Sequence, residues 1–448
     1  MAGEWQSSPF ERLLAEPVRN GVYKPKAFHG RGAKIVNMGE LFAHPRLRAV
    51  PMKRVELSGS ESERFTLSKG DLLFARRSLV AEGAGKCSVV LDINEPTTFE
   101  SSIIRARPDN AKAEPLFLYY FFNSTAGLHF LDTIRRQVAV AGITGSDLSR
   151  LEIPVPPLLE QRAIAHILGT LDDKIELNRR MNETLETMAR ALFKSWFVDF
   201  DPVRAKAEGC DPGLPQPLAD LFPDRFVDSE LGEIPEGWEM AVVGDRVRCI
   251  KGKSYKREHL QDGDTALVTL KSFARGGGYR SDGLKGYAGD FKGEQVVRAG
   301  ELVVACTDVT QAAEVVGKPA LVRSSDEFAT LVASLDVVVV RPRNDSVSVP
   351  FLYCLFRTDQ FSDHTYAHST GTTVLHLSKD AVPSYRFVLP TKNVANAFEC
   401  IAELLFKRLD ENERESRTLA VLRDTLLPKL ISGELRVKDA ERFVGEVV

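Results

Sequence analysis

The sequence predicts an α+β protein: two mixed α/β modules separated by two long helices that pack as an antiparallel coiled coil, with an internal pseudo-two-fold repeat. Three observations predict this fold. The chain repeats itself at an offset of about 234 residues, each repeat ends in a long segment with apolar residues at a 3.5-residue period, and short β-rich runs between turn residues fill the rest.

The repeat is visible in several short strings. RPDNAKAEPLFLYYFF, which starts at Arg107, matches RPRNDSVSVPFLYCLF, which starts at Arg341, and LEIPVP matches YRFVLP at the same offset. Upstream, KGDLLFA resembles AGELVVA at an offset of 230. Two copies are too few for a solenoid, so each half is predicted to be one globular module followed by one helix.

Both helical segments carry a 4-3 spacing of apolar residues, which is typical of a coiled-coil seam. About 40 residues in each segment would form a rod of roughly 60 Å. The seam is predicted at Ile164, Leu168, Leu171, Ile175, Asn178, Leu185 and Leu192 of the first helix and at Leu405, Leu409, Asn412, Leu419 and Leu426 of the second. Asn178 and Asn412 occupy equivalent positions, and either meet near a pseudo-two-fold axis or turn out to solvent.

Proline- and glycine-rich strings divide the chain. PVPP opens the first helix, DPVRAKAEGCDPGLPQPLADLFPD is predicted to be an irregular linker, and IPEGW opens the second module, whereas the first module lacks this opening and starts near Phe10. The predicted divisions are a first module at 1–156, a central helix at 157–200, a linker at 201–233, a second module at 234–390, a distal helix at 391–436 and a tail at 437–448.

Short β-rich runs recur in both modules. They are AKIVNM, DLLFA and CSVVLDI in the first and LVTL, ELVVAC and LDVVVV in the second, separated by Gly, Asp and Asn. PLFLYYFF and PFLYCLF predict one or two helices beside these strands. We therefore expect each module to contain a curved or barrel-like sheet with helices.

The charge of the chain is unevenly distributed. The net charge is −3, but residues 1–155 carry +4, residues 240–390 carry +2, and the remainder carries −9. Phosphate binding depends on local positive charge, so the overall charge does not exclude nucleic acid. The acidic parts are better suited to face protein.

The sequence contains no recognisable set of catalytic residues. It has no N/D-P-P-Y/F motif, no GxGxxG after a strand and no HExxH, and its six cysteines include no CxxC pair, so no metal site is expected. GAGKCS and KGKS resemble P-loops only in part, because Val80 and Val247 stand where the first glycine is needed. Scattered cysteines, no signal peptide and no apolar span favour a cytoplasmic protein that does not bind membranes.

The helical strings are similar to the repeats of a known family. IPVPPLLEQRAIAHILGTLDDKIELNRRMNETLETMARALFKSWFVDFDPVRAKAEG resembles the central repeat of type I restriction-modification specificity subunits. TLAVLRDTLLPKLISGELRV resembles their distal repeat, and IPEGWE resembles the start of a second target-recognition domain. The resemblance covers the whole chain in its order of module, helix, module, helix.

The resemblance implies a DNA-reading subunit without catalysis of its own. Each module would read one half of a split double-stranded DNA site, and the helices would fix the gap and dock two methylation subunits. Those partners would bind S-adenosylmethionine and methylate adenine at N6. Separate motor and endonuclease subunits would use ATP and Mg²⁺, so no cofactor is expected in this chain.

Candidate DNA contacts are residues that can donate hydrogen bonds to base edges or phosphates. In the first module they are Arg76, Arg77, Arg135, Arg136, Gln137 and Thr144, with Arg46 and Arg48 as further cations. In the second module they are Lys251, Lys253, Tyr255, Lys256, Arg257, Lys271, Arg275, Arg280, Thr372 and Thr373. The cluster at 251–257 is the strongest candidate, and the backbone at Gly276–Gly278 is expected to approach phosphates closely.

Two alternatives stay open at this point. The chain could serve a methylation-only complex that lacks the motor, a difference that this sequence does not encode. It could also be a scaffold that holds a protein assembly on a coiled coil and does not bind DNA. Retention on heparin and salt-dependent DNA binding would separate the DNA reader from the scaffold.

Overall fold

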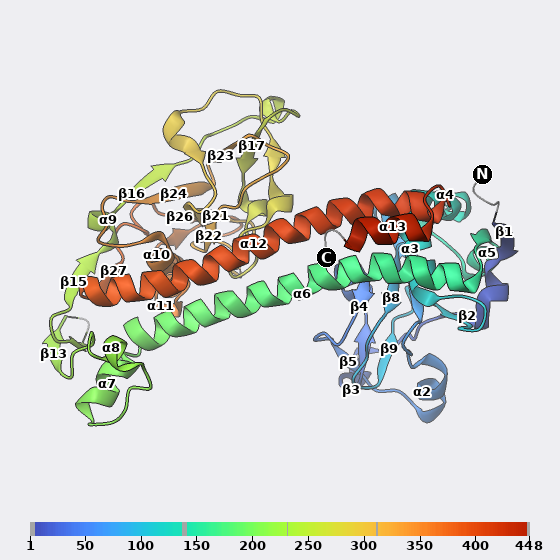
Figure 1. Ribbon diagram of the computed structural model, residues 1–448, viewed down its shortest axis with the longest axis horizontal. Helices are drawn as coiled ribbons and strands as arrows, with labels where there is room; N and C mark the ends of the chain where they lie inside the picture. Colours follow the sequence, from blue (N-terminus) through green and yellow to red (C-terminus); the bar gives the residue numbers. More distant parts are fainter. Residues whose placement is uncertain (1–4, 137–140, 231, 311, 446–448) are drawn as a thin grey trace. The chain divides into compact units, whose positions relative to one another are not determined.

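The computed structural model describes residues 5–136, 141–230, 232–310 and 312–445. The chain divides into two compact units: unit 1 comprises Met1–Asn178 with Arg414–Val448, and unit 2 comprises Arg179–Glu413. Each unit therefore holds one module together with part of each long helix (Figure 1). The mixture of helices and sheets confirms the predicted α+β class.

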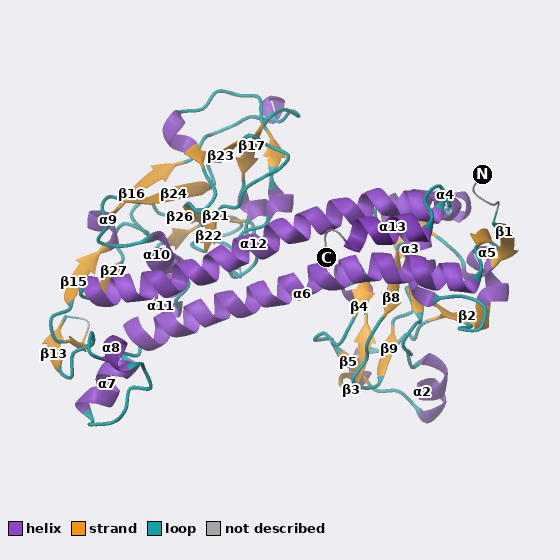
Figure 2. Ribbon diagram, viewed as in Figure 1, coloured by secondary structure: helices purple, strands orange, loops and turns teal. Residues whose placement is uncertain are grey.

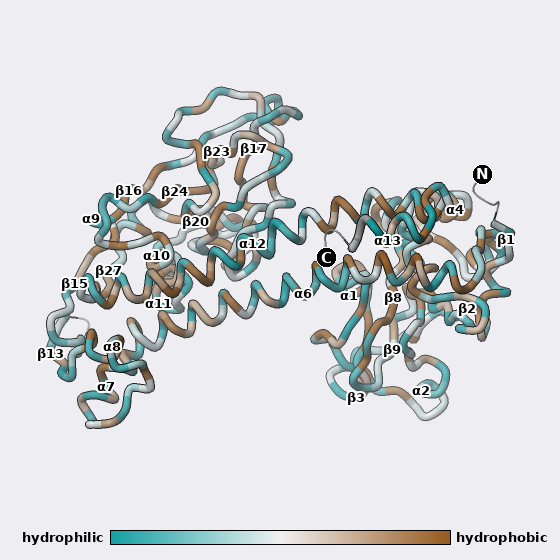
Figure 3. The backbone as a smooth tube through the Cα atoms, viewed as in Figure 1, coloured by the Kyte–Doolittle hydropathy of each residue, from teal (hydrophilic) through white to brown (hydrophobic). Residues whose placement is uncertain are grey.

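The two long helices are α6 (Leu158–Phe197) and α12 (Lys392–Ile431), which pack against each other in opposite directions (Figure 2). Both show alternating hydrophobic and hydrophilic residues along their length (Figure 3), as amphipathic helices do. α12 ends earlier than the predicted residue 436, because Gly433 takes the left-handed conformation (φ 72°) that terminates helices.

Unit 1 has two main sheets. Their strands are β2 (Leu14–Asn20), β3 (His29–Val36), β4 (Arg46–Leu47), β5 (Arg54–Val55), β6 (Leu72–Ala75), β8 (Cys87–Val90), β9 (Thr97–Phe99) and β10 (Ile103–Pro108). One sheet has the order β2-β10-β6-β8-β4 and the other β5-β3-β9, in which β3 and β9 run parallel. The predicted runs AKIVNM, DLLFA and CSVVLDI lie in β3, β6 and β8.

Unit 2 repeats this topology. Its strands are β16 (Val247–Lys251), β17 (Thr265–Val268), β18 (Lys285–Gly286), β19 (Val296–Val297), β20 (Leu302–Ala305), β22 (Pro319–Leu321), β23 (Thr330–Ala333) and β24 (Val337–Pro342). The order β16-β24-β20-β22 reproduces β2-β10-β6-β8, and the parallel pair β17 and β23 reproduces β3 and β9. The repeat that is visible in the sequence is therefore a repeat of topology.

Each module begins with a strand that pairs with the strand leading into a long helix. In unit 1, β1 (Gln6–Pro9) pairs antiparallel with β12 (Glu152–Val155), and in unit 2, β15 (Glu239–Val242) pairs with β27 (Arg386–Leu389). Trp5 precedes β1 as Trp238 precedes β15. The first module therefore begins with β1, ahead of the expected start near Phe10, while its sequence lacks the string PEGW as expected.

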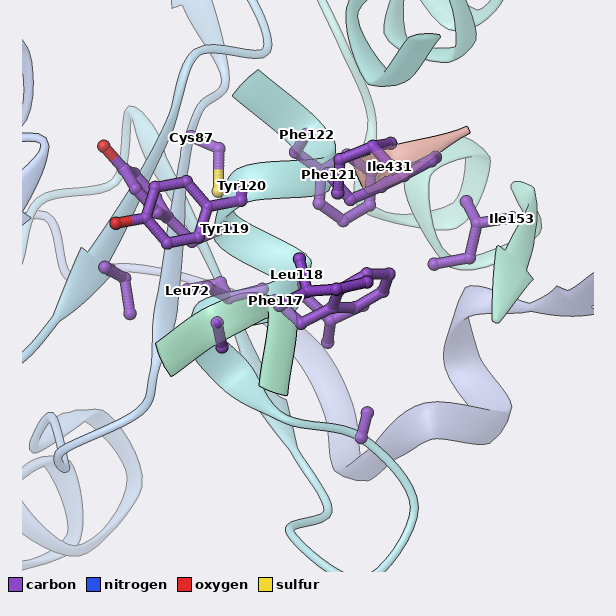
Figure 4. Packing of buried hydrophobic residues seen from close by; sticks show 14 of the residues in the cluster. Leu72, Cys87, Phe117, Leu118, Tyr119, Tyr120, Phe121, Phe122, Ile153 and Ile431 are labelled. Carbon is purple, nitrogen blue, oxygen red and sulfur yellow. The ribbon is translucent and has the colours of Figure 1, made fainter. Parts of the chain in front are cut away.

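An aromatic helix anchors each module on the long helices of its own unit. In unit 1 this helix is α3 (Pro115–Asn123), whose side chains from Phe117 to Phe122 are buried together with Ile153 and Ile431 (Figure 4). In unit 2 it is α10 (Val349–Phe356), where the ring of Phe351 lies 5.0 Å from that of Phe193. Large buried rings supply much of the apolar area that holds such interfaces together.

The segments after the two long helices are folded, contrary to the prediction of an irregular linker and a tail. The first contains α7 (Asp201–Ala207), α8 (Gln216–Ala219) and the hairpin β13 (Phe226–Ser229) and β14 (Gly232–Pro235), and the second forms α13 (Val437–Gly445). The rings of Phe222 and Trp196 lie 5.1 Å apart. Packing of this kind orders the segment after α6, although its amino-acid composition is typical of a loop. No helix in the described ranges is long and apolar enough to cross a membrane.

Candidate nucleic-acid interface

A short strand follows the central strand of each main sheet. In unit 1, β7 (Arg77–Ser78) follows β6 and pairs with β11 (Ala141–Gly142). In unit 2, β21 (Thr307–Asp308) follows β20 and pairs with β26 (Leu375–Leu377), whose other neighbour is β25 (Ser369–Thr370). We call these the recognition edges: residues 77–80 with 141–142 in unit 1, and 307–310 with 369–377 in unit 2.

Three predicted arginines lie at the recognition edge of unit 1. Arg77 is exposed, and within the described ranges its side chain has no hydrogen-bond or ion-pair partner. Arg76 is half-buried and donates to the carbonyl of Ser101 at 3.2 Å, while Arg136 forms an exposed ion pair with Asp147 at 2.7 Å. Arg77 and Arg136 are therefore exposed cations beside β11. Gln137 lies outside the described residues.

Two other predicted contacts of unit 1 support the fold beside this edge. Arg135 donates through Nη2 to the carbonyl of Ala84 at 3.0 Å and pairs with Asp132. Thr144 caps α5 (Gly145–Ser149), accepting from the amide of Asp147 at 3.1 Å. It also donates to the carboxylate of Asp147, which lowers the pKa of that group. DNA contact by Arg135 and Thr144 stays a prediction, and both side chains already form hydrogen bonds within the protein.

The segment at 251–257 reaches the recognition edge of unit 2 through Asp336. The amide of Lys253 donates to the carbonyl of Ala333 at 2.7 Å, which fixes this segment on the sheet. Burial and the charge of Asp336 raise the pKa of Tyr255, and Asp336 also accepts a hydrogen bond from Thr307 of β21 at 2.7 Å. The exposed cations of this segment are Lys251, Lys256 and Arg257. Lys256 faces Glu258 at 3.6 Å.

A hollow of about 510 Å³ lies on another side of β21. It is lined by the predicted contacts Lys271, Arg275 and Arg280, together with residues 307–310. Arg275 pairs with Glu314 at 3.3 Å, and Arg280 pairs with Asp282 at 2.5 Å. The carboxylates hold these exposed guanidinium groups in place, and such surface pairs are weak enough to exchange partners for a phosphate.

The amides of the glycine loop at Gly276–Gly278 are engaged within the protein. All three glycines have positive φ, and their amides donate to the carbonyls of Glu314, Pro319 and Ala274. The loop therefore offers no free amide to a phosphate, and a close approach of its backbone to phosphates stays a prediction. Thr372 and Thr373 are exposed in the turn between β25 and β26, directly after Gly371 (φ 121°).

Sequence reasoning missed a pair of equivalent exposed apolar residues at the recognition edges, and a third, Val80, beside the first (62% exposed). Leu79 is 90% exposed and Val309 is 71% exposed. The offset of 230 that aligns KGDLLFA with AGELVVA also pairs these two residues. The repeat could therefore have identified them, whereas their exposure is visible only in the structure.

The predicted seam residues line the inner sides of α6 and α12. Ile164, Leu168, Leu171, Asn178, Leu409, Asn412, Leu419 and Leu426 are buried, and Ile175, Leu185, Leu192 and Leu405 are half-buried. In unit 1, Asn178 donates to Ser416 at 3.3 Å, and in unit 2, Asn412 donates to Asn182 at 2.9 Å. Ser416 and Asn182 are themselves repeat equivalents, so the two hydrogen bonds join equivalent pairs of residues. Of the two alternatives for these asparagines, solvent exposure is excluded, since both are 1% exposed.

A buried polar cluster fixes the first module on the long helices of unit 1. Asp172 of α6 accepts hydrogen bonds from Tyr120 of α3 at 2.7 Å and from Arg423 of α12 at 2.6 Å. Burial opposes the charge on Arg423, but the hydrogen bond and charge of Asp172 outweigh it and raise the Arg423 pKa. Arg46 and Arg48, which stay predictions as further DNA cations, both bind Asp173, at 2.9 and 2.6 Å.

The described ranges offer no candidate site for a metal ion. They contain no group of three or more His, Cys, Asp or Glu side chains that could hold a metal ion. The pair His364 and His368 lies within one helix and its turn, where the ring of His364 contacts the carbonyl of Ala381 at 2.8 Å. Both rings are therefore used in local packing.

Comparisons with known proteins agree with this architecture. Residues 35–187 match the family described as "Type I restriction modification DNA specificity domain". The chain is 25% identical to the type I restriction enzyme HindI specificity subunit of Haemophilus influenzae, over 89% of this chain and 94% of that protein. It is 28% identical to the MjaIX specificity subunit of Methanocaldococcus jannaschii, over 72% and 69% of the two chains.

A solved structure shares the fold. The crystal structure of a type I restriction-modification S subunit from M. genitalium superposes with a TM-score of 0.55 at 15% identity, covering 95% of this chain and 96% of that one. The paired long helices, the repeated module topology and the sequence matches point to the same relatives. Residues 35–187 therefore match the specificity domain of type I restriction-modification systems, and most of the chain is similar to the specificity subunits of these systems.

Proposed function

We propose that this chain binds double-stranded DNA at a split site and that each unit reads one half of it. The observation that carries the proposal is that exposed cations lie on or near the repeated recognition edge in both units. They are Arg77 and Arg136 beside β11 in unit 1, and, in unit 2, Lys271 in the hollow beside β21 with Lys251 and Arg257 in the 251–257 segment. Cations of this kind hold a duplex by its phosphates, while arginine, threonine and apolar groups distinguish base edges. The loops differ between the units, so the two half-sites need not match.

The helices are proposed to set the gap between the half-sites and to dock two methylation subunits. The exposed apolar side chains of Leu177, Met188, Leu404 and Val421 lie on α6 and α12 and suit a protein partner. S-adenosylmethionine would bind to those partners, and ATP and Mg²⁺ would serve motor and endonuclease subunits. Acting on cellular and invading DNA, the assembly would work in the cytoplasm.

A matched deletion tests the role of the helices. Residues 177–183 and 411–417 are repeat equivalents and lie at the centre of α6 and α12, so removing both blocks keeps the flanking seams in register. The rods shorten by roughly 10 Å, and the recognised gap should shorten by about three base pairs with both half-sites unchanged. Methylome sequencing of cells that express the chain with its partners reports the gap. An unchanged gap contradicts this role of the helices.

A module exchange tests which unit reads which half. Replacing residues 234–390 by the second module of another specificity subunit should change one half-site and leave the other intact. A change in both halves would contradict independent reading. Absence of any salt-dependent DNA binding would favour the scaffold alternative, and methylation without cleavage in the complete assembly would favour a methylation-only complex.

A further inference from the structure

Two exposed apolar side chains occupy the same place in both modules. Leu79 and Val309 are equivalent at the offset of 230, and each directly follows the short strand of its recognition edge, β7 or β21. A single exposed aliphatic residue is ordinary on a protein surface. Here, however, an exposed aliphatic residue occurs at the same topological position in both modules, while the other residues of the two loops differ. This indicates that the two residues have the same function.

Each of these residues lies at the apex of a turn that its predecessor closes. In unit 1 the hydroxyl of Ser78 accepts from the amide of Val80 at 3.1 Å, and in unit 2 the carboxylate of Asp308 accepts from the amide of Thr310 at 2.7 Å. Such side-chain turns hold the middle residue outward. Asp308 also accepts from the amide of Val315 at 2.6 Å, so the Val309 loop is fixed from both sides.

The surroundings of both residues are charged and include cations; in unit 2 the carboxylates Asp282 and Glu314 pair with two of these cations. Val309 lines the hollow that also holds Lys271, Arg275 and Arg280. Leu79 lies two residues from the exposed Arg77, and Ser78 pairs with Ala141 of β11. A protein partner would be met by a large continuous apolar patch, whereas here the exposed apolar group is small: Val309 in unit 2, and Leu79 with its 62% exposed neighbour Val80 in unit 1. Cations lie beside both groups. The ligand that matches is anionic and carries small apolar groups in fixed places.

Duplex DNA has this chemistry, because the C5-methyl of thymine is the apolar group on the base edges of the major groove. We propose that Leu79 and Val309 each contact the C5-methyl of a thymine in the half-site that their own unit reads. This proposal rests on the proposed function.

The test removes the methyl group from the DNA and the side chain from the protein. The full chain first selects its site from a random duplex pool. The selected duplex is then remade with deoxyuridine in place of thymine in one half-site at a time. Affinity should fall about fourfold for one lost methyl contact, and Leu79→Ala should cause a similar loss on unmodified DNA. On Leu79→Ala protein, deoxyuridine in the same half should cause no further loss, and Val309→Ala should behave likewise for the other half.

Matched controls separate this contact from general effects of exposed apolar residues. Leu159→Ala in unit 1 and Val227→Ala in unit 2 remove side chains that are 80% and 41% exposed away from the recognition edges, and should leave both affinities unchanged. If the wild type selects a split site but neither deoxyuridine nor Leu79→Ala changes its affinity, the methyl contact is overturned and the proposed function stands. If the wild type selects no sequence, the proposed function itself fails, and this inference with it.

Discussion

Two neighbouring aspartates at the helix interface of unit 1, Asp172 and Asp173, are expected to contribute unequally to the stability of the fold. Asp172 is buried and binds Tyr120 and Arg423, whereas Asp173 is largely exposed and binds Arg46 and Arg48. Removing one member of a buried pair leaves a charge without compensation, while exposed pairs contribute little because water competes for them.

Asp172→Ala should therefore lower the free energy of unfolding by about 3 kcal/mol, and Asp173→Ala by less than about 1 kcal/mol. Denaturant unfolding, followed through the buried aromatic residues of unit 1, measures both. Equal losses in the two variants would show that Asp172 is no better shielded from water than its neighbour.

The element α2 (Gly59–Phe65) depends on a single carboxylate at its start. Glu61 accepts from Lys24 at 2.6 Å and from the amide of Ser58 at 2.8 Å, and these bonds, led by that of Lys24, lower its pKa from 4.5 to about 2. A lowered pKa means that the capping contribution is complete above pH 4.5 and is lost as the pH falls through about 2.

The Glu61 carboxylate should thus remain ionised at pH 3, which carbon NMR of its carboxyl group reports. Lys24→Met should raise the midpoint toward 4.5, because the main hydrogen bond is gone. Lys26→Met, two residues away and exposed, should leave the midpoint unchanged. A midpoint that Lys24→Met does not move would assign the shift to Ser58 alone.

How far the sequence predicts this molecule also differs from element to element. The long helices and the repeat are predictable because periodicity accumulates over 40 residues, and the α3 and α10 helices follow from aromatic strings. The folding of residues 201–235 is not, because contacts such as Phe222 with Trp196 order it. The candidate interface is predictable as a set of basic residues. The sequence does not show that Arg135 and Thr144 are already engaged, or that Leu79 is exposed.

At the scale of the molecule, each unit takes part of both long helices, and the repeat makes these parts interchangeable in principle. Residues 179–197 of α6 are the repeat equivalent of residues 413–431 of α12. Within unit 1, the seam residues Leu168 and Leu171 are buried in the cluster that also contains Leu419 and Leu426. A chain that ends at residue 210 lacks this cover, but a second copy of the same chain carries its equivalent.

Such a truncated chain should dimerise, with α6 of each copy covering the seam of the other. Arg423, the nearest cation to Asp172, has Ala189 as its equivalent, so in this dimer each Asp172 keeps only the more distant Arg46, at 3.9 Å. Ala189→Arg should tighten the dimer, whereas Ala189→Leu should not. Analytical ultracentrifugation measures the dissociation constants. A monomeric truncated chain would show that the two helix segments are not interchangeable.

The interleaving of the two units also sets an order of events during synthesis. Unit 2 is one continuous stretch and can close as soon as Glu413 has emerged, whereas unit 1 begins with the N-terminus and waits for Arg414–Val448. At about 5–20 residues per second, roughly 12–50 s separate the two parts of unit 1 on the ribosome. Through that interval the apolar side of the first half of α6 is open to chaperones and to neighbouring nascent chains. Unit 1 is therefore the first unit to be synthesised and the last whose fold can be completed.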